Sequence, residues 1–356
     1  MKMLTRHRLR CIGLCAVAML ALGIVMPQHT GAPGSAAAEI YRWRDRDGHL
    51  HFSEGPGPDI ENQGAHAEGP PANAAPTPSS EASPVPAPGA HAKSGLFWRI
   101  HAPGKKPSFL LGTIHSADQR VTRLRAAVAN ALDGCDRFIM EMKMDTDAFM
   151  QFGTSMMLAQ DTDLKNLIGG KLFQQAVQAM ASYGIPEPVV RRLKPWAIIA
   201  VLSMPQSDGG LILDLVLFQR ATGQGKTTSG LESAGEQLAV FEGLSLQDQI
   251  ELLDMTLKSL PSQPQMFEQL IEAYAEDDLK RLTDIARLDP EQSRSASARR
   301  FMTRLNDDRN RRMAQRIIPY LEQGNSFIAV GALHLAGPRG ILALLRRSGY
   351  DTEPVP

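Results

Sequence analysis

The sequence is short of cysteine, aromatic residues and net charge, and each shortage excludes a class of protein. Its 356 residues contain three cysteines, 6% aromatic residues, and 38 basic against 38 acidic residues. This balance provides no basic excess for binding nucleic acid, so we expect no nucleic-acid partner. Few aromatic residues and 16 methionines favour a helix-rich body over a β-sandwich. The length allows one large core with an appendage.

The first 38 residues have the layout of a secretory signal peptide. Lys2 and three arginines precede an apolar run over Cys11–Met26, and Ala36-Ala37-Ala38 before Glu39 matches an A-x-A cleavage site. Cleavage at this point predicts an exported, periplasmic protein. An uncleaved membrane anchor is the alternative, although the run is short for the ~30 Å hydrocarbon core of a bilayer.

Loss of the signal peptide would leave Cys135 as the one cysteine, so the mature chain could form no internal disulfide. Cys135 precedes the strand-like segment Arg137–Met142, and we expect it to be a buried structural side chain. The alternative is a nucleophilic cysteine, but no histidine is its near neighbour in sequence.

Two segments separate the signal peptide from the main domain. Residues 39–60 predict a small β-hairpin module, because two short alternating strands flank an Asp/Gly turn. The module resembles a small bacterial envelope domain of unknown function, which implies contact with the main domain or the cell envelope. Its His49 and His51 share a strand face and are interpreted as solvated, with a metal pair as the alternative. Residues 61–93 are rich in proline and alanine and predict a disordered linker.

Residues 94–356 predict a domain of the α/β class. Strands are expected at its two ends and helices between them, with one further strand at 226–230 in the middle. A long charged helix is expected over 299–322. The pattern predicts a central sheet built from the two ends of the domain, with a mostly helical insert.

The two ends of this domain contain the same phrase, a buried apolar strand that closes in G-x-x-H. The first copy is Ser108–His115 and the second is Ser326–His334, which has one extra residue. Glycine at the strand end allows close approach of other backbone. Histidine then lies just beyond the carboxyl end of the strand, where open α/β sheets bind ligands. A single such phrase would indicate a core histidine, but two copies favour a functional pair.

Two imidazoles and one carboxylate form a common site for a divalent metal ion. Glu141 ends the apolar strand Arg137–Met142 and would supply the carboxylate. Its alternative is a surface glutamate. Glu232 ends another short strand and could be a second ligand, a general base or a residue that orients one histidine.

The order of these motifs resembles the TraB/GumN family, which includes the TIKI proteases. The family pattern is a G-T-x-H, a strand-ending Glu, an L-K-P-W helix start, an L-E element followed by Gln, an R-N pair and a closing G-x-x-H-L-x-G. The matching segments, in order, are Gly112–His115, Glu141, Leu193–Trp196, Leu231-Glu232 with Gln237, Arg309-Asn310 and Gly331–Gly337. One departure is that Leu211–Leu213 separates Gly210 from Asp214 of the family's D-x-x-L element.

The resemblance implies a fold akin to the erythromycin-esterase/ChaN group and a hydrolytic site with a divalent metal, Mn²⁺ or Co²⁺, with Zn²⁺ as a further option. Its metal ligands would be His115, Glu141 and His334. Glu232, Arg309 and Asn310 would be the catalytic residues, with Arg309 contacting a substrate carboxylate or an oxyanion. A solvated helix arginine is the alternative for Arg309.

The sequence therefore predicts a periplasmic metal-dependent hydrolase, with peptides as the preferred substrates. The metal would activate a water molecule, and Glu232 or Glu141 would transfer the proton. The alternative is a non-catalytic regulatory protein that binds a peptide or glycan in the same cleft. Two other features are interpreted as structural: Trp196 as a packing residue, and Gly223–Lys226 as a helix end without the opening glycine of a phosphate-binding loop.

Overall fold

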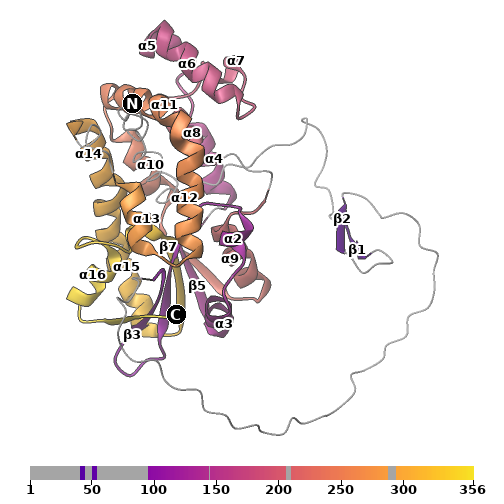
Figure 1. Cartoon of the computed structure of the whole chain (residues 1–356), viewed down its shortest axis with the longest axis vertical. Helices are drawn as coiled ribbons and strands as arrows, with labels where there is room; N and C mark the ends of the chain where they lie inside the picture. Colours follow the sequence, from indigo (N-terminus) through magenta and orange to yellow (C-terminus); the bar gives the residue numbers. More distant parts are fainter. Residues whose placement is uncertain (1–40, 45–49, 54–94, 144, 206–209, 288–293) are drawn as a thin grey trace, which may run out of the picture. The chain divides into compact units, whose positions relative to one another are not determined.

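The computed structural model describes residues 41–44, 50–53, 95–143, 145–205, 210–287 and 294–356 (Figure 1). The predicted signal peptide and the predicted linker lie outside these residues. Near the N-terminus, strands β1 (Tyr41–Arg44) and β2 (Leu50–Ser53) pair antiparallel, with Tyr41 opposite Ser53. The turn between them and the side chains of His49 and His51 are outside the description. Among the helices of the described ranges, none has the length and apolar character needed to span a bilayer.

A six-stranded mixed sheet forms the centre of the main unit. Its strands are β3 (Phe97–His101), β4 (Ser108–Thr113), β5 (Arg137–Met142), β6 (Thr227–Glu232), β7 (Ser326–Gly331) and β8 (Asp351–Pro354). They are ordered β6-β5-β7-β4-β3-β8. The first four run parallel, and β3 is antiparallel to both β4 and β8. The α/β class is confirmed. Sequence reasoning did not predict β8.

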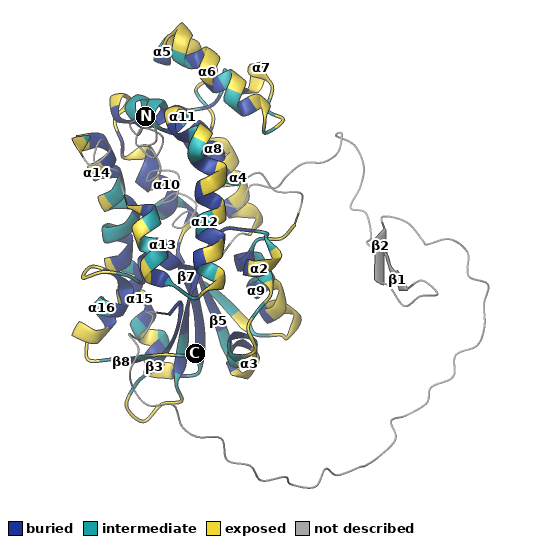
Figure 2. Ribbon diagram, viewed as in Figure 1, coloured by how far each residue is buried: buried dark blue, intermediate teal, exposed yellow. Residues whose placement is uncertain are grey.

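Apolar side chains hold the sheet together on both faces. All six residues of β7 are buried, which explains the apolar run that follows Ser326. The Phe327 ring lies 6.1 Å from Phe138 of β5 and 6.0 Å from Phe97 of β3, so aromatic contacts join three strands. Figure 2 shows these central strands as a buried layer.

Helices make up most of the remaining main unit. They are α2 (Gln119–Thr122), α3 (Ala126–Gly134), α4 (Thr146–Ser155), α5 (Leu164–Ile168), α6 (Gly170–Ala181), α7 (Glu187–Val190), α8 (Pro195–Leu202), α9 (Leu213–Gly223), α10 (Ala234–Glu242), α11 (Leu246–Ser259), η1 (Leu260–Ser262), α12 (Gln263–Ala275), α13 (Leu279–Ala286), α14 (Ala296–Met302), η3 (Thr303–Asp308), α15 (Arg309–Gln323), η4 (Ala332–His334) and α16 (Ile341–Arg347). Helices α3 and α9 lie on one side of the sheet, and α15 and α16 lie on the other (Figure 1).

The long helix predicted over 299–322 is present, but it contains a π-helical segment that was not predicted. It runs without a gap through α14, the π-helix η3 and α15. The π-helix ends at Asp308, directly before Arg309 and Asn310, and such wide turns often occur at functional positions. An amphipathic sequence pattern does not distinguish a π-turn from an α-turn, so this segment could not be predicted.

Two residues and one segment interpreted as structural are confirmed as such. Cys135 is buried, and burial raises the pKa of its thiol to about 12. Trp196 is fully buried, with its ring centroid 5.0 Å from that of Phe241. Helix α9 ends at Gly223, and Gly225 follows with a φ of +71°, a conformation that favours glycine.

The two G-x-x-H phrases lie side by side. Strands β4 and β7 are parallel neighbours, with Thr113 opposite Gly331, so the extra residue of the second phrase shifts its glycine by one position. A Cβ atom on Gly112 would lie 2.7 Å from the Leu335 side chain and 3.0 Å from the Ala332 backbone. The first phrase therefore needs glycine so that the turn of the second phrase can pack against it.

We predict that Gly112→Ala lowers the free energy of unfolding by about 1–3 kcal/mol, because the added methyl group must displace η4 and Leu335. Chemical denaturation measures this change. Gly153→Ala in α4 is the control, since a Cβ there meets nothing within 4 Å and alanine favours a helix. Equal stability of Gly112→Ala and wild type would contradict the close packing of the two phrases.

Candidate functional site

The carboxyl ends of the four parallel strands carry the candidate site. Glu141 lies near the end of β5, Glu232 ends β6, and His115 and His334 follow β4 and β7. All four residues are buried, although each is polar. Polar groups at such depth require partners, so their contacts show what each can do.

His115 is oriented by an aspartate that is distant in sequence. Its Nδ1 lies 3.0 Å from Oδ2 of Asp214 in the first turn of α9, and Oδ1 of Asp214 accepts a hydrogen bond of 2.8 Å from Thr113. Burial acts to lower the pKa of His115, but the charge and hydrogen bond of Asp214, with Glu141 adding to them, raise it above its ordinary value. Within the described residues, His115 Nε2 has no hydrogen-bond partner.

His334 is oriented in the same manner by Asn310. Its Nδ1 lies 2.6 Å from Oδ1 of Asn310, whose Nδ2 donates to the carbonyl of Arg339 at 3.0 Å. An amide oxygen only accepts hydrogen bonds, so Nδ1 of His334 is the protonated nitrogen. In the neutral ring Nε2 carries the lone pair; this nitrogen lies 3.5 Å from Oε1 of Glu141.

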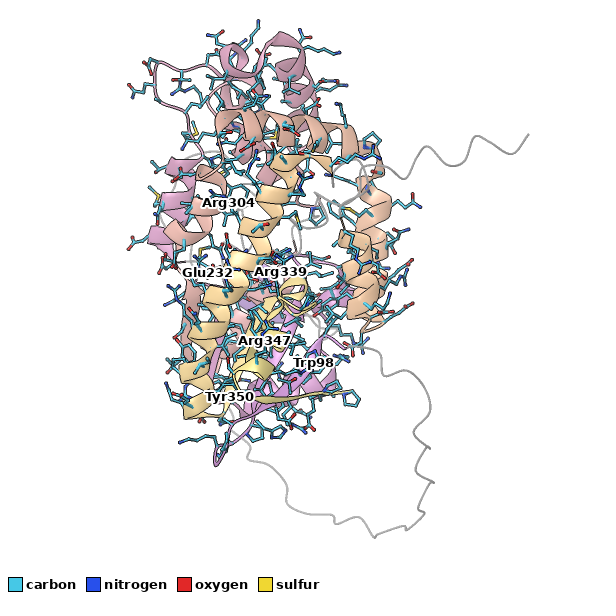
Figure 3. The ribbon with its side chains drawn as sticks, turned by 90° about the vertical axis from the view of Figure 1, so that its left-hand side faces the viewer. Trp98, Glu232, Arg304, Arg339, Arg347 and Tyr350 are labelled. Carbon is cyan, nitrogen blue, oxygen red and sulfur yellow. The ribbon has the colours of Figure 1, made fainter. Side chains whose placement is uncertain are left out.

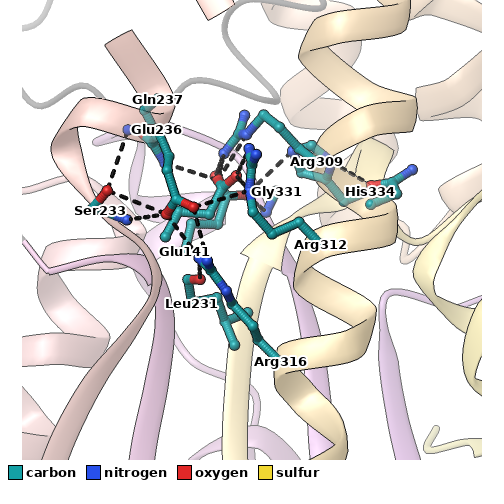
Figure 4. Close-up of polar contacts among 12 residues, drawn as sticks. Glu141, Leu231, Ser233, Glu236, Gln237, Arg309, Arg312, Arg316, Gly331 and His334 are labelled. Carbon is teal, nitrogen blue, oxygen red and sulfur yellow. Dashed lines mark hydrogen bonds and ion pairs between the residues drawn. The ribbon is translucent and has the colours of Figure 1, made fainter. Parts of the chain in front are cut away.

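Glu141 is bound through both of its oxygens. Oε1 accepts a hydrogen bond of 2.5 Å from the amide of Gly331, and Oε2 accepts one of 2.6 Å from Nη2 of Arg309 (Figure 4). The glycine of the second phrase thus binds the glutamate of the neighbouring strand. This contact explains how a buried charge is tolerated at the end of β5.

Arg309 and Arg312 of α15 enclose Glu232. Arg309 donates from Nε to Oε2 at 2.8 Å, and its Nη2 lies 2.7 Å from the same atom. Arg312 donates to Oε1 from Nε at 3.0 Å and from Nη2 at 2.6 Å. Gln237 adds a contact of 3.4 Å to Oε2. Glu232 and Arg309 are completely or almost completely inaccessible, while the Arg312 side chain is 30% exposed.

This cluster lies deep within the main unit. Figure 3 shows Glu232 between the helical layer that carries Arg304 and the end of the unit that carries Trp98 and Tyr350. Figure 4 shows the carboxylates of the β5–β6 end facing the guanidinium groups of α15.

An open cleft of about 690 Å³ adjoins this cluster. It is lined by the ends of β5 and β6, by α4 and α10, and by Arg316 of α15. Met142, which follows Glu141, and Glu232 itself both contribute to the lining. A ligand in this cleft would lie next to Glu232, whereas His115, Glu141 and His334 are not among the residues that line it.

The donor types at this edge fit a divalent metal ion, but their arrangement is incomplete. Two imidazoles have Nδ1 engaged by a carboxylate or an amide, which is the usual support of a metal-ligating histidine. The unpartnered Nε2 of buried His115 is the strongest sign of a missing ligand. However, no group of three or more His, Cys, Asp or Glu side chains within the described ranges is arranged to hold a metal ion.

The structure brings together some of the residues predicted for the site. Glu141 contacts His334 and Arg309, and Arg309 contacts Glu232. His115 contacts Asp214, and the charge of Glu141 contributes to the raised pKa of His115. Sequence reasoning did not assign Asp214 to His115, although a charged residue within the apolar start of α9 was an available signal.

Arg312 was also missed, because it lies in a run of arginines that suggested a solvated helix face. Its spacing of three residues from Arg309 places both side chains on one face of α15, which was the available signal.

Comparisons with known proteins identify the family of the chain. The model of the TraB/PrgY/gumN family matches residues 96–354, and a domain of unknown function (DUF4124) matches residues 30–88. Similar curated proteins include metalloprotease TIKI2 of Xenopus tropicalis (28% identity) and metalloprotease TIKI1 of Homo sapiens (30%). Each alignment covers 47% of this chain and 37% or 38% of the relative, so the chain spans well under half the length of these relatives. No solved structure matches the chain.

Proposed function

Because the chain belongs to the TraB/PrgY/gumN family, we propose that it is a metal-dependent hydrolase that cleaves peptides at the carboxyl edge of its parallel strands. The observation that carries this proposal is the pair of buried histidines whose Nδ1 atoms are anchored by Asp214 and Asn310. In each ring Nε2 is then the nitrogen that a metal ion would take. The similar TIKI proteins are named metalloproteases, which supports the same class.

We assign the metal to His115, His334 and Glu141. Two nitrogens and one carboxylate suit Mn²⁺, Co²⁺ or Zn²⁺, and Mn²⁺ or Co²⁺ are the metals that the resemblance to TIKI proteins favours. When bound, such a cation polarises a carbonyl group and activates water near neutral pH. The chain's own contribution is to fix the ligands and to exclude bulk water around them.

The three residues predicted to be catalytic receive positioning roles in this proposal. Asn310 holds the tautomer of His334, and Arg309 holds Glu141. Glu232 holds Arg309 and has both oxygens bound by guanidinium groups, so we do not assign it the proton transfer. The burial of Arg309 likewise argues against direct contact with a substrate.

The substrate would lie in the cleft between α4 and α10. Its volume of about 690 Å³ suits a short peptide segment. Ala148 and Gln151 of α4 and Ala234 of α10 would contact such a segment.

A non-catalytic protein that binds a peptide or glycan in the same cleft is the second candidate. The observation that favours it is the pairing of Glu141 with Arg309, which occupies one oxygen of the carboxylate needed for a metal. Metal content separates the two candidates, because a binding protein needs no metal in order to hold its ligand.

The location of the protein in the cell and the division of its chain into segments are also proposed. We propose export to the periplasm with residues 1–38 as signal peptide, 39–60 as a module that contacts the cell envelope, 61–93 as linker and 94–356 as the hydrolase domain. We also propose that this domain shares the erythromycin-esterase/ChaN type of fold. The basic start, the apolar run and the A-x-A site support the export.

For the export, sequencing of the N-terminus of protein from the periplasmic fraction should give Glu39 as the first residue. Membrane-bound protein that retains Met1 would contradict a cleaved signal peptide.

For the metal site, we predict that His115→Ala and His334→Ala abolish uptake of Mn²⁺ and cleavage of a peptide library. Glu141→Gln should weaken metal binding by about 10- to 100-fold, because it removes the ligand charge. Elemental analysis of protein prepared without chelator, followed by titration calorimetry, measures both effects. His101→Ala is the control, since His101 is 42% exposed and pairs with Glu353. Unchanged metal content with lowered melting temperature would identify the two histidines as core residues only.

For the cleft, we predict that Gln151→Trp lowers kcat/KM for a peptide by about tenfold or more without changing metal affinity, because the indole fills space beside the site. Gln178→Trp is the control, because Gln178 is an exposed residue of α6 that does not line the cleft. Equal peptide turnover by Gln151→Trp and Gln178→Trp would mean that the substrate binds elsewhere.

A further inference from the structure

We propose that Arg309 is an internal counter-cation that competes with the divalent metal for Glu141, and that Glu232 and Arg312 set how strongly it competes. The inference rests on the proposed function, because it concerns the affinity of the same metal site. It adds that three residues which are not metal ligands control the affinity for the metal.

The position of Arg309 makes it a competitor. Its Nη2 lies 2.6 Å from Oε2 of Glu141 and 2.7 Å from Oε2 of Glu232, so one nitrogen bridges the two carboxylates. The side chain is 1% exposed, and water screens its charge very little. A metal ion on Glu141 would therefore bind next to a full positive charge that already neutralises its ligand.

The charges of the cluster balance without a metal ion. Glu141 and Glu232 contribute two negative charges, and Arg309 and Arg312 contribute two positive ones. These four side chains thus sum to zero in the arrangement of Figure 4. A divalent cation adds two positive charges to this neutral set. Its affinity must then depend on the net charge that the set carries.

The two oxygens of Glu232 are divided between the two arginines. Oε2 receives Nε and Nη2 of Arg309, and Oε1 receives Nε and Nη2 of Arg312. Arg309 is therefore held on Glu232 by Nε and Nη2, and on Glu141 by the same Nη2. Arg312 binds Oε1 of Glu232 and so leaves Oε2 facing Arg309. The positive charge of Arg312 also offsets part of the negative charge of Glu232, which then attracts Arg309 less strongly.

Neutralising different members of the cluster should move metal affinity in opposite directions. Arg312→Gln leaves the set with one negative charge and releases Glu232 to hold Arg309 more strongly, so Mn²⁺ should bind about tenfold tighter or better. Glu232→Gln leaves one positive charge and directs Arg309 to Glu141, so Mn²⁺ should bind about 10- to 100-fold more weakly. The double variant restores neutrality and should return close to wild type.

The test is titration calorimetry of the full mature chain with Mn²⁺ alone, repeated at two salt concentrations. Arg311→Gln is the matched control, because Arg311 is the neighbouring arginine on α15, is 59% exposed, and loses the same charge. Its affinity for Mn²⁺ should equal that of wild type. Thermal melts of each metal-free variant show whether it is folded, and Arg312→Gln is the safer variant because Arg312 is partly exposed.

The outcomes separate this inference from the proposed function. Tighter binding by Arg312→Gln together with weaker binding by Glu232→Gln supports the counter-cation. Weaker binding by both folded variants, or no change in either, overturns it while leaving the metal site in place. Absence of Mn²⁺ uptake by the wild-type chain overturns the metal site and the inference together. Should Glu232→Gln fail to fold, Arg312→Gln and the double variant decide the sign of the effect.

Discussion

The bridge that Arg309 makes between Glu141 and Glu232 is the interaction on which the rest of the site depends. Two carboxylates at the ends of adjacent strands would repel each other in a region almost closed to water. A buried charge without a partner costs several kcal/mol, so the strand ends could not approach α15 without the guanidinium group. The bridge therefore ties three elements together and gives Glu141 a defined orientation.

The parallel register of β4 and β7 provides the second constraint. Because Thr113 lies opposite Gly331, the two histidines emerge from neighbouring strand ends. Each is then oriented through Nδ1 by a residue of a helix packed beside the sheet: Asp214 on α9 for His115, and Asn310 on α15 for His334. The sheet sets where the imidazoles emerge, and the helices set which nitrogen is available.

The balance of charge in this cluster bears on both candidate functions. The side chains of Glu141, Glu232, Arg309 and Arg312 together carry no net charge, so this cluster is stable without a further ion, which suits a binding protein as well as an enzyme. In the proposed enzyme the affinity for a metal ion would depend on these charged neighbours of Glu141.

The sequence by itself determined the elements that local pattern controls. The α/β class, the two strands that close in G-x-x-H, the strand-ending Glu141 and Glu232, and the burial of Cys135 all followed from apolar runs and the residues that end them. That the two G-x-x-H strands are parallel neighbours was decided by the fold. These signals are local because strand formation and burial depend on neighbouring residues. Only the tertiary structure decided which charges meet. Asp214 is 99 residues from His115, and Glu232 is 77 residues from Arg309. The π-turn before Arg309 and the sixth strand β8 were also decided there, because both depend on packing partners that a local pattern does not contain.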